Sequence, residues 1–204
     1  MVGRFVHIEE VVGPIPTAPT KNMTNLEIIN LLQRITGLVA LGLITLQIYL
    51  GASRKAIWLH KINGIVAYTF ILVHPILFLL SRKIIYDRFD FYYIFVDACV
   101  LCDKPYDFLI NFGRIAFYLI TTAVLAVKLR GVVPWLKTNW RKLHILNYLA
   151  FYFVSFHSIN IGTDSAQSLF LVYFGFCQIV VLYSIINRLR REGFASKLKN
   201  RLGL

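Results

Sequence analysis

Five long apolar windows constrain this chain more than any other feature of its sequence. They cover residues 26–50, 56–80, 108–127, 143–161 and 167–186. Each approaches or exceeds the roughly 20 residues that an α-helix needs to cross the hydrocarbon core of a bilayer. Hydrophobic residues make up 57% of the chain, which is more than an average soluble domain contains. We therefore expect an all-α membrane protein, with a bundle of five transmembrane helices in residues 26–187.

The two ends of the chain differ from this central domain. Residues 1–25 contain Pro14, Pro16 and Pro19 and no apolar core, so they resemble neither a signal peptide nor a sixth span. We expect a polar N-terminal arm there. Residues 188–204 form a basic tail that we expect to be cytoplasmic.

The distribution of charge predicts the orientation in the membrane. Lys and Arg concentrate in the first and third connections and in the tail, whereas residues 81–107 hold five Asp against four Lys and Arg. Because basic loops stay in the cytoplasm, the N-terminus is predicted to lie outside the cell membrane and the C-terminus inside. The net charge of +12 then follows from topology and contact with membrane lipid. Nucleic acid is not expected as a partner.

Four of the five histidines fall in two predicted spans. Span 56–80 contains His60 and His74, and span 143–161 contains His144 and His157. Both spans start at the cytoplasmic face, so His60 can face His144, the inner pair, and His74 can face His157, the outer pair. At 1.5 Å per residue the two levels lie about 20 Å apart. Ionisable residues inside a membrane are candidates for function.

Two facing imidazoles suit haem better than a bare metal ion. A structural zinc site needs four ligands, and neither level has Cys, Asp or Glu to complete one. Haem needs two axial ligands, because the porphyrin supplies the other four nitrogens. The alternative is a structural role, in which these histidines are buried and hydrogen-bonded between helices. On an ideal helix the side chains of His60 and His74 point in directions about 40° apart around the axis, whereas those of His144 and His157 point about 140° apart. Either span 143–161 is distorted, or its two rings reach their irons from different sides of the helix.

The paired spacing, thirteen residues between His60 and His74 and twelve between His144 and His157, resembles that of the ferric reductase-like transmembrane domain family. The family includes the NADPH oxidases, the iron reductases and the haem subunit of the methionine sulfoxide reductase system. The resemblance implies two stacked b-type haems (heme b, with iron), ligated by His60 and His144 and by His74 and His157, that carry electrons outward. Arg34 occupies a place similar to an oxygen-site arginine of the oxidases. A second oxygen-site histidine is absent, because Phe78 stands at that position.

No flavin or nicotinamide site is expected on this chain. The tail is too short to fold one, and no glycine-rich dinucleotide fingerprint is present. The electron donor is therefore expected to be a separate cytoplasmic flavin reductase or a quinol, which makes the chain an oxidoreductase component. The acceptor could be ferric iron, oxygen, a quinone or an extracytoplasmic partner protein.

A few further residues are candidates for holding the haems. Gly37 and Gly64, like Gly113, could let a helix approach a flat macrocycle, although ordinary helix packing would also explain them. Arg34 and Arg114 could meet haem propionates or could be interfacial arginines that reach toward water. Cys99 and Cys102 form a CxxC whose role, disulfide or redox relay, stays open.

Three other functions remain as alternatives. The first is a quinol-linked cytochrome b that anchors a larger redox complex. The second is a haem-free membrane transporter or scaffold, in which the histidines join helices. The third is a haem-sensing or haem-binding module that moves no electrons.

Overall fold

The computed structural model is all-helical over the residues that it describes, 21–54, 56–97, 105–162 and 164–202. No strand occurs in these ranges, so the predicted all-α class is confirmed. The helices are α1 (Lys21–Ser53), α2 (Ile57–Tyr86), α3 (Phe91–Phe95), α4 (Pro105–Leu129), α5 (Pro134–His144), α6 (Leu146–Ile161) and α7 (Ser168–Leu202).

Four helices in the described part of the chain are long and apolar enough to cross a membrane. They are Asn25–Ser53 in α1, Ile57–Tyr86, Pro105–Leu129, and Ser168–Arg191 in α7. The remaining predicted span, 143–161, is divided, because α5 ends at His144 and α6 has only 16 residues. At the junction the Tyr148 N–H donates to the carbonyl of Ile145 at 3.0 Å, a step of three residues where a regular α-helix takes four.

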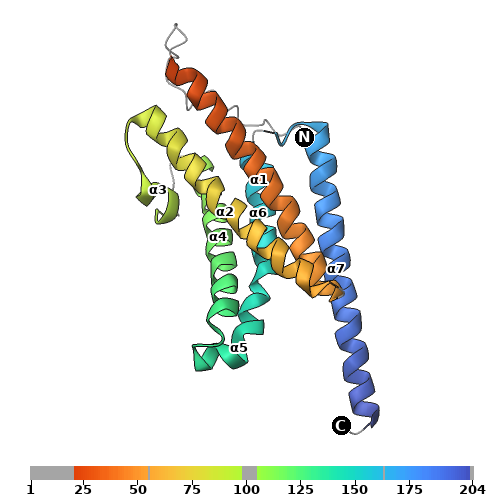
Figure 1. Cartoon of the computed structure of the whole chain (residues 1–204). Coiled ribbons are helices and arrows are strands. Elements are labelled where there is room, and N and C mark those ends of the chain that lie inside the picture. The colour runs from red at the N-terminus through yellow and green to blue at the C-terminus, as the bar shows by residue number, and fades with distance from the viewer. Residues whose placement is uncertain (1–20, 55, 98–104, 163, 203–204) are drawn as a thin grey trace.

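The helices pack as two antiparallel pairs that α1 joins. Within the described residues the most extensive packing is between α1 and α2 and between α4 and α6. Helix α1 also packs against α7 and, less extensively, against α6. Figure 1 shows α1 between α2 and α7, with α6 behind it. The chain thus brings two histidine-bearing segments, α2 and α5–α6, to the same bundle through helices that carry no histidine.

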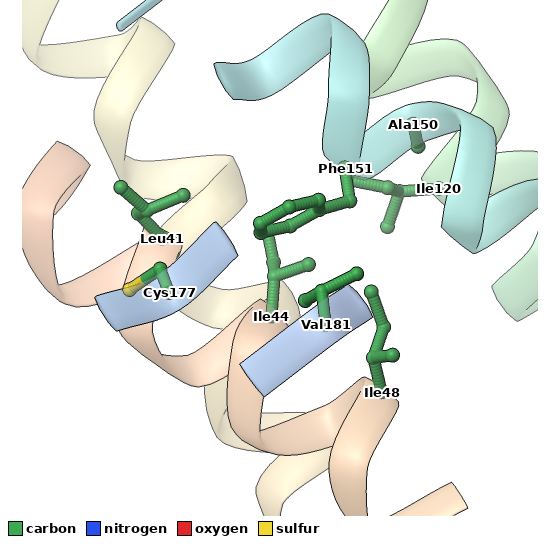
Figure 2. Close-up of a cluster of buried hydrophobic side chains, with 8 residues drawn as sticks. All are labelled: Leu41, Ile44, Ile48, Ile120, Ala150, Phe151, Cys177 and Val181. Atoms are coloured by element: carbon green, nitrogen blue, oxygen red, sulfur yellow. The ribbon is translucent and has the colours of Figure 1, made fainter. Parts of the chain in front are cut away.

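The buried apolar core holds α1, α4, α6 and α7 together. Helix α1 supplies residues at positions 41, 44 and 48, a spacing of three and four that places them on one helix face. The whole cluster comprises Leu41, Ile44, Ile48, Ile120, Ala150, Phe151, Cys177 and Val181 (Figure 2). Helix α2 contributes no buried residue to this cluster, although its Tyr68 and Ile71 pack against it, and the few buried residues of α2 include the polar Asn63 and Ser81.

Candidate functional site

The inner pair of histidines comes together from α2 and from the end of α5. The ring centroids of His60 and His144 lie 6.0 Å apart, and the ring planes are nearly perpendicular at 82°. A metal bound between two imidazoles needs about 2 Å to each nitrogen, and adding roughly 1 Å from each nitrogen to its ring centre gives a separation of about 6 Å. The observed separation therefore leaves room for one metal ion between the rings.

The outer pair lies on α2 and α6. His74 and His157 are close enough to interact electrostatically. Pro75 follows His74 directly, and α2 continues through it. The structure thus places the His60 and His144 rings side by side and has His74 and His157 interact electrostatically, while haem binding at either pair stays a prediction.

Three of the four histidines have Nδ1 near a backbone carbonyl of a neighbouring helix. The Nδ1 atom of His60 lies 3.2 Å from the Gln47 carbonyl oxygen, and that of His74 lies 3.0 Å from the Gln33 carbonyl oxygen. On the other side of the bundle, His157 faces the Leu109 carbonyl at 3.5 Å and His144 interacts with the Ala123 carbonyl. The Nδ1 atom of His144 instead lies 3.4 Å from the side-chain amide nitrogen of Asn147.

The carbonyl contacts set the state of the imidazoles of His60, His74 and His157. A carbonyl oxygen only accepts a hydrogen bond, so the proton of a neutral imidazole must sit on Nδ1. The Nε2 atom then keeps its lone pair, which is the form in which histidine binds a metal, and its orientation is held by the same hydrogen bond.

Three glycines make these close approaches possible. Each follows its carbonyl by four residues, so it lies on the same face of the helix one turn further on. A Cβ atom at Gly37 would lie 3.0 Å from Cε1 of His74, and one at Gly51 would lie 3.1 Å from Cε1 of His60. At Gly113 the distance to Cε1 of His157 would be only 2.7 Å. The imidazoles therefore occupy the space that a side chain would take.

The sequence analysis missed Gln33, Gln47 and Gly51, although a signal was present. Residues 33–37 and 47–51 both read Gln-x-x-x-Gly, and the two copies are fourteen residues apart, as His60 and His74 are. Because α1 and α2 are antiparallel, the equal spacing brings each copy opposite one histidine. Gly64 has a different role from the one expected, since a Cβ there would lie 2.9 Å from Nε2 of Gln47 and not against a histidine.

The two arginines expected near the outer level both have protein partners. Arg34 forms a two-point ion pair with Asp164 in the α6–α7 connection, with Nε 3.0 Å from Oδ2. Arg114 is buried, and its Nε donates to the Ile94 carbonyl at 3.0 Å while its other nitrogens bond Tyr93 and Asn111. Arg114 thereby fastens α3 to α4. Contact of either arginine with a haem propionate stays a prediction.

An aromatic residue connects the inner pair to the basic end of the bundle. The Trp140 and His144 ring centroids are 6.0 Å apart. The Arg130 guanidinium lies over the Trp140 ring at 4.8 Å, and that of Arg141 at 5.4 Å. This makes α5 a cationic surface in contact with the inner histidines.

The donor set limits which groups could bind. Among the residues that the structure describes, no group of three or more His, Cys, Asp and Glu is placed to hold a metal ion. Cys99 and Cys102 lie outside the described residues.

Comparison with known proteins adds no information on function. No family model, curated protein or solved structure matches the chain.

Proposed function

We propose that this protein carries single electrons across a membrane through two bis-histidine b-type haems. His60 and His144 would ligate the inner haem, and His74 and His157 the outer. The observation that carries the proposal is the set of backbone carbonyls at Nδ1, with Gly37, Gly51 and Gly113 leaving room for the rings. In His60, His74 and His157 this arrangement leaves Nε2 as the acceptor nitrogen, which is the atom that would bind an iron.

The chain's own residues would do three things for such a group. They present Nε2 lone pairs in fixed orientations, they exclude water by surrounding the site with apolar helices, and they separate the two levels by fourteen residues of α2. Haem supplies the one-electron chemistry when bound. The ligand geometry is what the ferric reductase-like resemblance also implies.

Outward transfer is what the ferric reductase-like resemblance implies, and the charge distribution indicates which end of the bundle faces the donor. With the basic end in the cytoplasm, the donor would be a separate flavin reductase or a quinol that reaches the α5 surface beside Trp140. The acceptor would lie beyond the outer pair, on the side of α3.

The direct test is a count of haem per chain. We expect detergent-purified protein to give two b-type haems by pyridine haemochrome assay, with a reduced-minus-oxidised spectrum of low-spin haem. Each of His60→Ala, His74→Ala, His144→Ala and His157→Ala should lose about one. His7→Ala, which changes the one histidine outside the pairs, should keep both. A haem-free wild type from cells that make haem would overturn the proposal in favour of a transporter or scaffold.

A further inference from the structure

Gln47 contacts both ring nitrogens of His60. Its backbone carbonyl lies 3.2 Å from Nδ1, and its side-chain Nε2 lies 3.2 Å from Nε2 of the histidine. Since Nδ1 faces a carbonyl and carries the proton, Nε2 of His60 is an acceptor. The Gln47 amide therefore donates to the lone pair that a metal would need.

A second residue fixes the Gln47 amide in this orientation. Asn63 is buried on α2, and its Nδ2 donates to Oε1 of Gln47 at 2.8 Å and to the Leu43 carbonyl at 3.0 Å. With its oxygen engaged by Asn63, the Gln47 amide points its NH₂ group toward His60. Gly64 opens the space for that NH₂ group. The contact is part of a buried polar network.

The outer level has the same backbone arrangement without this side-chain contact. Gln33 is the counterpart of Gln47, fourteen residues earlier, and its carbonyl faces His74. Over the described residues, no hydrogen bond joins the Gln33 side chain to His74. On the α1–α2 side, the two levels thus differ in whether a side-chain amide covers the Nε2 lone pair.

We propose that Gln47 is a specificity-determining residue that covers the inner ligand, so that the outer site takes up haem first and more tightly. This rests on the proposed function. Binding at the inner site must break the hydrogen bond between Gln47 and His60, whereas binding at the outer site breaks no equivalent bond. One hydrogen bond of typical net strength corresponds to an affinity difference of roughly three- to tenfold.

The test is a titration of haem-depleted protein with haemin, followed by Soret absorbance. The double variant His74→Ala/His157→Ala retains only the inner site, and His60→Ala/His144→Ala retains only the outer site. We expect the inner site to bind roughly three- to tenfold more weakly. Gln47→Met, which keeps the side-chain length and removes the amide, should remove that difference. Gln33→Met is the matched control and should leave outer affinity unchanged.

Asn63→Ala provides a second variant, because it releases the Gln47 amide without changing Gln47. Like Gln47→Met, it should strengthen haemin binding at the inner site. Circular dichroism would confirm that the helices remain. Unchanged or weaker inner binding in Gln47→Met, with both haems still bound by the wild type, would overturn the role of Gln47 and leave the electron-transfer proposal standing. If Gln47→Met does not fold, the same outcome in Asn63→Ala decides. A wild type that binds haem at neither level overturns both.

Discussion

In the half of the bundle built from α1 and α2, the two histidines and the two carbonyls that face them are equally spaced. In the half built from α4, α5 and α6 they are not. The carbonyls of Leu109 and Ala123 are fourteen residues apart, like those of Gln33 and Gln47, but His144 and His157 are thirteen apart. One half keeps a continuous helix, and the other reaches a similar arrangement by ending α5 at His144 and starting α6 at Leu146.

The comparison of the two halves separates a feature that they share, the spacing of the carbonyls, from one in which they differ, the continuity of the helix. The supporting carbonyls have the same separation in both halves, while the histidine-bearing helix can be continuous or divided. The division also accounts for the 140° difference in facing expected on an ideal helix, because His144 does not belong to the same helix as His157. Position of the carbonyl, more than helix regularity, determines where each ring lies.

The strongest test of this comparison changes the spacing at the junction. Insertion of one alanine after Ile145 would restore a fourteen-residue spacing but rotate α5 by about 100° relative to α6. We expect His144 to leave the Ala123 carbonyl and the protein to lose about one haem of two. The measurement is haem per chain.

The control for that insertion is one alanine after Gly131. It lies in the exposed connection between α4 and α5, where added length is tolerated. Retention of both haems by the Ile145 insertion would mean that the junction has no role in placing His144.

A smaller but still large effect is expected from Gly113→Ala in the second half. The added Cβ would meet Cε1 and Nδ1 of His157 at 2.7 and 2.8 Å, so the ring must move off the Leu109 carbonyl. We expect haem affinity at the outer site to fall more than tenfold in a haemin titration. Gly175→Ala, in α7 with no atom within 4 Å of the added Cβ, is the matched control and should bind normally.

The glycines of the first half sharpen the same comparison. Added Cβ atoms at Gly37 and Gly51 would lie 3.0 and 3.1 Å from His74 and His60, so these rings need to shift by only a few tenths of an ångström. We expect Gly37→Ala and Gly51→Ala to weaken haem binding by a few-fold, less than Gly113→Ala. A larger loss at Gly51 than at Gly113 would contradict the ranking.

The packing between the two halves can be weakened by a substitution in the apolar core. Phe151 on α6 is fully buried against α1 and α7 residues such as Ile44 and Val181 (Figure 2). Phe151→Ala should lower the free energy of unfolding by about 3 kcal/mol, seen as a lower melting temperature in detergent. Phe156→Ala, at an exposed position five residues further along α6, should cost much less.

The smallest effect is expected at the ion pair that joins α1 to the α6–α7 connection. The Arg34 side chain is 44% exposed, so solvent screens its interaction with Asp164. Asp164→Asn should change the free energy of unfolding by no more than about 1 kcal/mol. A loss of outer haem in this variant, without a change in stability, would instead point to a role for Arg34 in holding the haem.

The sequence predicted the parts of this structure that repeat along the chain. Apolar windows located four of the helices, and the spacing of the histidines located two levels. The exact junction at Ile145 was not predicted, because the apolar window begins at Leu143, two residues before it, and hydropathy does not show where the helix is interrupted. Backbone carbonyls such as that of Gln33 carry no side-chain signature, and the pairing of Arg34 with Asp164 joins residues 130 positions apart.

The short α6 has a consequence for the membrane around the protein. Sixteen residues of α-helix measure about 24 Å, less than the roughly 30 Å thickness of a typical hydrocarbon core. His144 precedes this helix, with Arg141 and Lys142 beside it. We expect the bilayer to thin locally at α5, or these cationic side chains to extend toward the headgroups. The inner pair would then lie close to the headgroup region, so lipid chain length would change how far a donor in the cytoplasm stands from it.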